Sequence, residues 1–235
     1  MEKTKVLYEG KAKIMYETDE PGKLIVYFKD DATAGNGAKK GTIEGKGSIN
    51  NEMSAFFFKM LKDHGINSHF VEKINDREMV VKSLDMIALE VIVRNVAAGS
   101  LAKRLGFPEG TPLKTPVLEY CYKNDELGDP IVNRYHIMVL DVASVNELDE
   151  IEHISFSVNQ ILSNFLRSKN INLIDFKLEF GRDENGKIVL ADEISPDNCR
   201  FWDITTNEKL DKDRFRRDMG GVEEAYQEML KRVTA

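Results

Sequence analysis

Cysteines and long apolar runs are scarce in this 235-residue chain, and their scarcity limits the classes of protein to which it can belong. The two cysteines, Cys121 and Cys199, are far apart and lack metal-ligand spacing, so we expect free thiols in a reducing compartment. The four histidines form no ligand-spaced pair either. No stretch approaches the roughly 18 apolar residues of a membrane helix, and the polar first residues are no secretory signal. We therefore expect a cytoplasmic protein without a membrane segment.

Basic runs are also scarce, and this bears on the partners of the protein. The formal net charge is −7, and the lysines and arginines are scattered along the chain. Because no basic face dominates, we do not expect binding to nucleic acid or to an anionic membrane surface. The composition, 42% hydrophobic and 31% charged, is that of an ordinary globular protein. The length suits one large domain or two lobes with a cleft between them.

The order of the periodic patterns predicts the fold class. Strand patterns cluster early and long helical patterns late, which favours an α+β fold over regular βαβ alternation. Ser144 and Glu147 form a capping box at the start of a long helix. Residues 30–48 hold five glycines and few large side chains, so we expect a mobile functional loop there. Prolines 108, 112 and 116 mark another loop. The main expected strands are 13–18, 23–29, 85–95 and 117–123, and the expected helices are 50–64, 101–105, 144–170, 211–217 and 222–233.

A predicted hairpin gathers carboxylates on one face. Its first arm alternates, with Asp175, Lys177 and Glu179 on one side and apolar residues on the other. Asn185-Gly186 is typical of a two-residue type I′ turn, which would place Glu179 directly opposite Asp192. Like charges in that position destabilise a sheet unless a positive group lies between them, and Mg²⁺ carrying a nucleotide phosphate would serve. The alternative is a solvated polar face with an incidental like-charge pair.

Two glycine-rich segments are candidates for a nucleotide site. Residues 41–48 resemble a P-loop, but the glycine spacing is one residue short and Lys46 precedes Gly47, so we reject this assignment. The segment Gly10-Lys11-Ala12-Lys13 opens a strand, where backbone amides could approach phosphates while the lysines neutralise charge. The alternative is a surface turn with solvated lysines.

An arginine and a helix start follow each other at the end of the 85–95 strand. Ser100 is expected to be the N-cap of the next helix, whose free amides attract anions. Arg94 could add a bidentate contact to the same anion. The segment 195–203 would bring Arg200 toward the same end of the hairpin. The alternative is an ordinary capped helix beside a surface salt bridge.

Taken together, these pieces resemble one known family. The segments that carry the resemblance are LYEGKAK at 7–13, MIALEVIVRNVAAGS at 86–100, LIDFKLEFG at 173–181 and DMGG at 218–221. They are similar to the SAICAR synthetase family of purine biosynthesis, and the similarity extends over essentially the whole chain. Two positions depart from the family pattern: Ala88, where proline is common, and Gly35, where an aromatic residue is frequent.

The resemblance implies an ATP-dependent ligase. It would join L-aspartate to the carboxylate of 5-aminoimidazole-4-carboxyribonucleotide through an acyl phosphate, and give SAICAR, ADP and phosphate. The implied fold is a two-lobed α+β architecture with antiparallel sheets and flanking helices, distantly like ATP-grasp and kinase folds, with the nucleotide cleft between the lobes. We expect residues 1–83 to form a β-rich nucleotide-covering lobe and residues 84–235 to form an α+β lobe with the metal and substrate site. A homodimer is also implied.

The resemblance further implies roles for single residues. Glu179 and Asp192 would hold Mg²⁺, and together with Asp175 and Lys177 they form the implied catalytic group. The residues implied for ATP are Gly10, Lys11, Ala12, Lys13, Lys82, Met86 and Lys123. The residues implied for the ribonucleotide and the cleft are Arg94, Ser100, Arg200 and Asp129.

Two other functions stay open at this point. A small-molecule kinase of related fold would use the same metal hairpin and glycine turn, but it would phosphorylate a hydroxyl group. A non-catalytic nucleotide-sensing module would tolerate the loss of one metal carboxylate. Against the second alternative, both Glu179 and Asp192 are present here beside Lys177.

Overall fold

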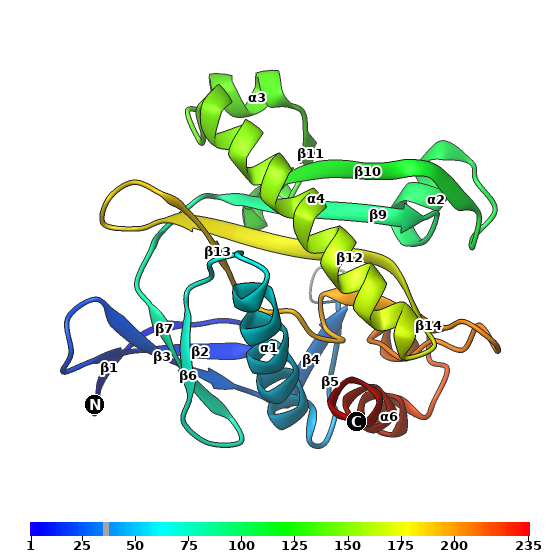
Figure 1. Ribbon diagram of the computed structural model, residues 1–235, viewed down its shortest axis with the longest axis horizontal. Helices are drawn as coiled ribbons and strands as arrows, with labels where there is room; N and C mark the ends of the chain where they lie inside the picture. Colours follow the sequence, from blue (N-terminus) through cyan, green and yellow to red (C-terminus); the bar gives the residue numbers. More distant parts are fainter. Residues whose placement is uncertain (35–37) are drawn as a thin grey trace.

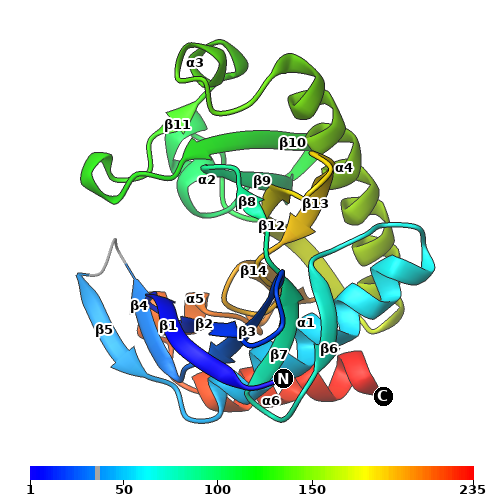
Figure 2. The same ribbon diagram turned by 90° about the vertical axis from the view of Figure 1, so that its left-hand side faces the viewer.

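Two antiparallel sheets with helices packed against them make up most of the protein (Figure 1). The structure is a computed structural model, which describes residues 1–34 and 38–235. Gly35, noted above, therefore lies outside the described residues. Figure 2 shows one sheet above the other, which confirms the two-lobed α+β fold expected from the sequence. None of the described helices is long and apolar enough to cross a membrane.

A five-stranded sheet forms the centre of the N-terminal lobe. Its elements are β1 (Lys3–Glu9), β2 (Lys13–Thr18), β3 (Lys23–Phe28), β6 (Phe70–Lys73) and β7 (Glu78–Lys82), with helix α1 (Lys46–Asp63) beside them. The strand order is β1-β2-β3-β7-β6. Helix α1 contacts β3, β6 and β7 and buries Phe57, Phe58 and Leu61. A separate two-stranded sheet consists of β4 (Asp31–Ala34) and β5 (Lys39–Thr42).

A seven-stranded sheet forms the centre of the C-terminal lobe. Its strands are β8 (Asp85–Met86), β9 (Leu89–Val96), β10 (Pro112–Tyr122), β11 (Ile131–Val132), β12 (Ile171–Arg182), β13 (Ile188–Ala191) and β14 (Cys199–Asp203). The order β11-β10-β9-β12-β13 describes the main path, and the long strand β12 also pairs with β8 and β14. Strand β12 therefore connects most parts of this sheet.

Helices join the strands, and one of them covers a face of the larger sheet. They are α2 (Gly99–Leu105), the 3₁₀ helix η1 (Asp125–Leu127), α3 (Arg134–Val139), α4 (Val145–Ser168), α5 (Asp213–Arg216) and α6 (Val222–Thr234). Helix α4 lies across the sheet and contacts β9, β12 and β13 (Figure 1). The predicted capping box is confirmed, because Ser144 Oγ accepts a hydrogen bond from Glu147 N at 3.3 Å and Glu147 Oε2 accepts one from Ser144 N at 2.7 Å.

The side chains of β9 and β12 divide between the core and the opposite face of the sheet. Val91 and Val93 on β9 and Phe176 and Leu178 on β12 are buried in the main core, together with Leu148 of α4. Successive side chains of a strand point to opposite faces, so the residues between them leave the core. On these two strands the intervening residues are largely charged, and this alternation creates a polar face on the sheet.

Parts of the glycine-rich segment 30–48 form regular elements that the sequence did not predict. In its described part, β4 and β5 form a hairpin, and α1 begins at Lys46 and not near residue 50. No side chain caps this helix, and Gly45 takes the N-cap position with φ 77°. The Lys46 side chain is buried, and its Nζ lies 2.9 Å from Asp197 Oδ2, 151 residues away in sequence. Local sequence patterns carry no information about so distant a partner.

Other element boundaries also differ from the prediction. The expected strand 85–95 is divided into β8 and β9, and β10 begins at Pro112, within the expected proline loop. A proline is tolerated there because β11 pairs only with the far end of β10, so that edge of β10 is open near Pro112. The expected helix 211–217 is reduced to α5, whereas α6 agrees closely with the expected helix 222–233.

The division into residues 1–83 and 84–235 follows the strands but not the helices. The strands of the five-stranded sheet all precede residue 84, and those of the seven-stranded sheet all follow it. Helix α6 at the C-terminal end, however, packs against α1 of the N-terminal part. The boundary therefore stays a prediction.

Candidate active site

The polar face of the seven-stranded sheet is the candidate active site. Cross-strand pairing brings distant parts of the chain together on it, for example Arg94 of β9 beside Asp175 of β12. We call this surface the charged face. It is formed by Glu90, Arg94, Glu119, Asp175, Lys177 and Glu179 of the strands, together with Lys123, which directly follows β10 and binds Glu179.

One end of the charged face is a cluster of ammonium groups and carboxylates. Lys177 Nζ donates hydrogen bonds to Glu179 Oε1 at 2.6 Å and to Asp192 Oδ2 at 2.8 Å. Lys123 Nζ donates to the other oxygen of Glu179 at 2.6 Å. Burial would raise the pKa of Asp192, but the ammonium groups of Lys13 and Lys177 outweigh this effect and hold the pKa well below its ordinary value. Both carboxylates of the predicted metal pair thus lie close to one positive group, the Lys177 ammonium.

Lys13 links the N-terminal lobe to this cluster. It is the first residue of β2, and its Nζ donates a hydrogen bond to Asp192 and lies 3.0 Å from Glu193 Oε1. Burial would lower the pKa of Lys13, but the charges of Asp192 and Glu193 outweigh it and raise the pKa above the ordinary value. The glycine turn and the metal hairpin, predicted separately from the sequence, therefore meet at one place.

The hairpin that carries this cluster has a different turn from the predicted one. Glu179 pairs with Ala191 and not with Asp192, so the register is shifted by one residue. The turn is a longer loop of residues 184–186, with Gly186 at φ 74°. It is closed by Asp183, whose Oδ1 accepts hydrogen bonds from the backbone N–H groups of Asn185 and Lys187, both at 2.9 Å. The predicted type I′ turn is therefore wrong.

Asp192 reaches the cluster in spite of the shifted register. It lies just beyond the end of β13 and adopts the left-handed conformation, with φ 63°. Such a conformation is uncommon for a residue other than glycine and costs of order 1–3 kcal/mol, so it persists only where the surroundings impose it. Here the surroundings include the ion pairs with Lys13 and Lys177.

The other end of the charged face combines two arginines around one carboxylate. Arg94 Nη1 donates to Asp175 Oδ2 at 2.8 Å, and Arg200 Nη1 donates to Asp175 Oδ1 at 2.9 Å. Arg94 Nε also donates to Glu119 Oε2 at 2.7 Å, and Arg200 Nε donates to Asp213 Oδ2 at 2.9 Å. Burial would lower the pKa of Arg200, but the charges of Asp175 and Asp213 outweigh it and raise the pKa. Asp175 thus holds both guanidinium groups side by side.

Helix α2 begins directly beside these arginines. Gly99 has φ 54°, and a Cβ atom on it would lie 2.6 Å from Arg200 Nη2, so only glycine fits here without displacing the arginine. Arg94 Nη2 donates to Ser100 Oγ at 3.2 Å. Ser100 is not the N-cap as predicted, because the helix begins two residues earlier and Ala98 takes the N-cap position. Arg94, Ser100 and Arg200 are nevertheless brought together as the sequence suggested.

The remaining predicted site residues lie around the edges of the charged face. Gly10 N donates to Lys13 O at 2.8 Å, which closes the turn between β1 and β2, and Ala12 lies within that turn. Lys11 is exposed, and its Nζ lies 3.3 Å from Asp125 Oδ1 of the C-terminal lobe. Lys82 and Met86 are exposed at the connection between the two sheets. Asp129 has φ 51°, and its Oδ1 accepts a hydrogen bond from Asn124 N at 2.9 Å, which closes the loop between β10 and β11.

Two acidic residues of the site were missed at the sequence level. Glu193 follows Asp192 and contacts Lys13, and its neighbour Ser195 donates a hydrogen bond to it. Glu90 lies 3.7 Å from Lys177 Nζ, and burial, opposed in part by Lys177, raises the pKa of Glu90. The alternation of the 85–95 segment places Glu90 on the same face as Arg94, and this signal could have found it.

The donor set around Lys177 fits a cation that carries phosphate. Mg²⁺ usually takes one or two carboxylates and fills its other positions with phosphate oxygens and water. Glu179 and Asp192 supply two such carboxylates around one positive centre. Among the described residues, no group of three or more acidic, histidine or cysteine side chains is arranged to hold a metal ion. Glu179 and Asp192 would thus be only two of the ligands of such a cation, and phosphate oxygens and water would supply the others.

Comparison with known proteins identifies the family of the chain. A family model described as SAICAR synthetase matches residues 6–233. The chain belongs to the SAICAR synthetase family. Two similar members, from Coprothermobacter proteolyticus and Clostridium novyi, are named phosphoribosylaminoimidazole-succinocarboxamide synthase. The first is 59% identical over 233 residues, with 99% of each chain covered. The second is 61% identical over 234 residues, with 100% of this chain and 99% of the relative covered.

Solved structures of SAICAR synthetases share the whole fold. The Ehrlichia chaffeensis phosphoribosylaminoimidazole-succinocarboxamide synthase has a TM-score of 0.96 at 46% identity and covers 98% of this chain and 99% of its own. A SAICAR synthetase in complex with ADP has a TM-score of 0.94 at 55% identity, with 97% of each chain covered. The family resemblance and the fold predicted from the sequence are confirmed.

Proposed function

We propose that the protein is an ATP-dependent ligase that joins L-aspartate to the carboxylate of 5-aminoimidazole-4-carboxyribonucleotide, and gives SAICAR, ADP and phosphate in de novo purine biosynthesis. Full-length membership of the SAICAR synthetase family carries this proposal. The similar structure in complex with ADP supports the use of ATP. The charged face gives further support to this proposal. It combines cationic side chains that could bind phosphate with two carboxylates that could bind a metal ion.

The chemistry explains why such a site needs many charges. A carboxylate does not react with an amine at neutral pH, because its oxygen is a poor leaving group. Transfer of the γ-phosphoryl group of ATP to the carboxylate would give an acyl phosphate, which the amine of L-aspartate attacks with release of phosphate. Phosphoryl transfer is catalysed mainly by positioning and by neutralisation of charge.

The ammonium cluster is assigned to ATP and to phosphoryl transfer. Glu179 and Asp192 would hold Mg²⁺, which neutralises phosphate charge when it is bound. The ammonium groups of Lys13, Lys123 and Lys177 lie around these carboxylates and can exchange them for phosphate oxygens. The turn that supplies Gly10, Lys11 and Ala12 would approach the phosphates through its backbone, and Lys82 and Met86 would lie near the adenine.

The arginine cluster is assigned to the phosphate of the ribonucleotide. Arg94, Arg200 and Ser100 offer donors within one small region, and Asp175 holds the two guanidinium groups together. The Nε and Nη1 atoms of Arg94 already bind carboxylates, so the Nη2 edge toward Ser100 is the one presented to a phosphate. Asp129, which lies in the loop after β10, is assigned to the substrate cleft.

The small-molecule kinase is the less favoured alternative, because the matching relatives carry the name of a ligase. An ADP-release assay with the imidazole ribonucleotide, with and without L-aspartate, separates the two. The ligase should release ADP in amounts that match SAICAR formation, and only when ATP, Mg²⁺, the ribonucleotide and L-aspartate are all present. Comparable turnover with a sugar or alcohol acceptor, and none with L-aspartate, would establish the kinase.

We also propose that the enzyme is a homodimer and that it works in the cytoplasm. Both proposals rest on membership of the family. Light scattering of the purified protein, with and without nucleotide, tests the first one directly. A mass equal to one chain under all conditions would reject the dimer.

A further inference from the structure

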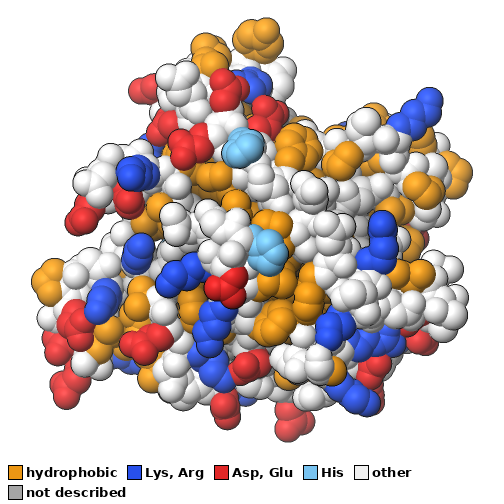
Figure 3. All heavy atoms as spheres, viewed as in Figure 1, with side chains coloured by type: hydrophobic (Ala, Val, Ile, Leu, Met, Phe, Trp, Pro, Cys, Tyr) orange, Lys and Arg blue, Asp and Glu red, His pale blue; other side chains and the backbone are white. Residues whose placement is uncertain are grey.

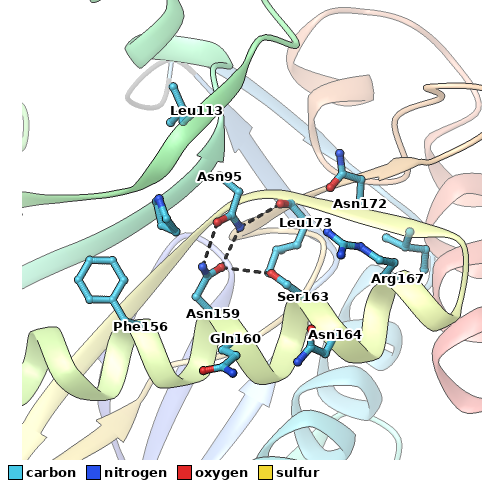
Figure 4. A pocket seen from close by; sticks show the side chains of 12 residues that line it. Asn95, Leu113, Phe156, Asn159, Gln160, Ser163, Asn164, Arg167, Asn172 and Leu173 are labelled. Atoms are coloured by element: carbon cyan, nitrogen blue, oxygen red, sulfur yellow. Dashed lines mark hydrogen bonds between the residues drawn. The ribbon is translucent and has the colours of Figure 1, made fainter.

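A hollow of about 460 Å³ lies on the side of the large sheet opposite to the charged face (Figure 4). It is lined by side chains of α4 together with residues of β9, β10 and β12. Figure 4 shows two amide side chains facing each other in it, Asn95 from β9 and Asn159 from α4. Asn95 is the immediate neighbour of Arg94, so one short stretch of β9 serves both faces of the sheet.

The two amides form a closed, reciprocal pair. Asn95 Nδ2 donates to Asn159 Oδ1 at 2.8 Å, and Asn159 Nδ2 donates to Asn95 Oδ1 at 2.9 Å. Asn95 Nδ2 also donates to the backbone carbonyl of Leu173 in β12, at 3.1 Å. Ser163 Oγ donates to Asn159 Oδ1 at 3.3 Å. The pair thus connects α4, β9 and β12 at a single point.

That point is the start of a bulge in β12. Leu173 pairs with Phe201 of β14, and Asp175 pairs with Arg200, so Ile174 is an extra residue between them. Two residues separated by one position share a face of a regular strand, whereas a bulge re-aims the side chains beyond it. Here Leu173 lies in the main core, and Asp175 lies on the charged face with the arginines. The bulge is what turns Asp175 toward the arginines.

Adjacent residues of β9 hold the two sides of this bulge. Arg94 binds the carboxylate of Asp175 on the charged face, and Asn95 binds the carbonyl of Leu173 on the α4 side. Pairing of β12 with β9 begins only at Asp175, so Leu173 is held to β9 through the Asn95 side chain and lies outside that pairing. The Asn95 amide is therefore the side-chain contact that ties the backbone at Leu173, and with it the start of the bulge, to β9.

We propose that Asn95 and Asn159 are positioning residues for the ribonucleotide-phosphate site. They fix the bulge of β12 from the α4 side of the sheet. They thereby keep Asp175, Arg94 and Arg200 in their positions relative to one another. The inference rests on the proposed function only in assigning the arginine cluster to a phosphate. Asn159 orients the Asn95 amide, and Asn95 holds the bulge, so the two contribute unequally. The loss of Asn95 removes every bond of the pair, whereas the loss of Asn159 leaves the bond from Asn95 to Leu173 in place.

Three leucine substitutions of similar volume test the proposal. Asn95→Leu should raise the KM for the ribonucleotide on the order of tenfold, with the KM for ATP unchanged within about twofold. Asn159→Leu should raise the KM for the ribonucleotide by a smaller factor. Asn164→Leu is the matched control, because Asn164 lies on α4 and lines the same hollow, yet its amide makes no hydrogen bond to any described residue. Affinity for ribose 5-phosphate, measured by calorimetry, should follow the same order.

A merely structural role gives a different pattern. Asn159 is the more buried of the two, so general destabilisation would lower the melting temperature most for Asn159→Leu and would leave the ratio of the two KM values unchanged. That pattern would overturn the proposal. If Asn95→Leu does not fold, the KM values and the melting temperature of Asn159→Leu decide the question alone. The unmodified protein separates the two failures. If it makes no SAICAR, the proposed function fails. The affinities of the variants for ribose 5-phosphate would then still test the positioning role.

Discussion

Glu179 and Asp192 accept hydrogen bonds from the same ammonium group. The Lys177 Nζ atom lies 2.6 Å from Glu179 and 2.8 Å from Asp192, and Lys13 binds Asp192 from the other lobe. Two facing carboxylates without this partner would repel each other, and neutralising one of them would stabilise the protein. With Lys177 in place the sign is reversed, since removal of either charge leaves a half-buried ammonium group under-compensated.

Asp192→Asn should therefore lower both stability and turnover. Without nucleotide or metal, loss of the ion pairs with Lys13 and Lys177 should cost on the order of 3 kcal/mol. Turnover should fall by roughly 10²-fold or more, because a ligand of the proposed metal is lost. Thermal melts without metal and steady-state rates across a Mg²⁺ titration measure the two effects. Glu184→Gln, in the exposed loop of the same hairpin, is the control. A more stable variant with normal turnover would contradict the assignment.

Lys177→Met should make the protein depend on a divalent cation for stability. Glu179 and Asp192 would then face each other without the ammonium group, and Mg²⁺ would replace its charge. We expect millimolar MgCl₂ to raise the melting temperature of this variant by about 2–4 °C more than that of the unmodified protein. Lys187→Met, in the exposed part of the hairpin, should show no added response. An equal response in all three proteins would place the cation elsewhere.

Gly99→Ala should weaken ribonucleotide binding more than its backbone strain explains. The new Cβ would lie 2.6 Å from Arg200 Nη2, so the guanidinium must move. Gly106→Ala at the other end of α2 is a matched control, because its φ of +71° imposes similar strain but nothing lies within 4 Å. Both variants should lose about 1 kcal/mol of stability or more. Only Gly99→Ala should raise the KM for the ribonucleotide, on the order of tenfold. Equal KM values in both variants would remove Arg200 from the site.

Arg94→Lys should impair use of the ribonucleotide far more than binding of ATP. A lysine cannot reproduce the contacts of Arg94 with Glu119, Asp175 and Ser100 at once, so we expect a loss of about 1–3 kcal/mol in kcat/KM for the ribonucleotide. Arg104→Lys is the control, since Arg104 also binds Glu119 but is exposed. Unchanged kinetics for Arg94→Lys would remove it from the phosphate site.

Asp211 should make the protein less stable as the pH rises from about 4 toward neutrality. Burial, and then the charge of Asp213, raise the pKa of Asp211 from 3.8 to about 7. A folded-state pKa above the unfolded value gives stability that is complete below about pH 4 and is lost as the pH rises toward about 7. This loss should amount to roughly 4 kcal/mol. Urea unfolding between pH 4 and pH 8 should show a shallower slope for Asp211→Asn, and an unchanged slope would exclude Asp211 as the titrating group.

Sequence patterns located the charged residues but not the backbone that carries them. Alternation in β12 put Asp175, Lys177 and Glu179 on one face, and this holds in the structure. The turn was mispredicted because the Asp183 side chain captures two backbone N–H groups and lengthens the loop. The side-chain competition at Asp183 outweighs the local preference of Asn185-Gly186 for a two-residue turn.

Long-range contacts explain the other differences. The start of α1 depends on the buried pair of Lys46 and Asp197, whose distance in sequence hides it from any local pattern. The strict alternation expected through Ile174 also fails, because Ile174 is the bulged residue and packs with Val96 and Trp202, apart from the main core. Such features arise only when β9, β12 and β14 are assembled.

Strand β12 fixes the distance between the two clusters of the charged face. It carries Asp175 of the arginine cluster and Glu179 of the ammonium cluster, four residues apart on one continuous strand. At about 3.3 Å per residue, the two clusters are held roughly 13 Å apart, a spacing that an extended strand cannot change without breaking its pairing on both sides. Under the proposed function, this length sets how far the reacting carboxylate of a substrate must lie from its phosphate. Shorter or longer analogues would bind at one cluster and fail to reach the other.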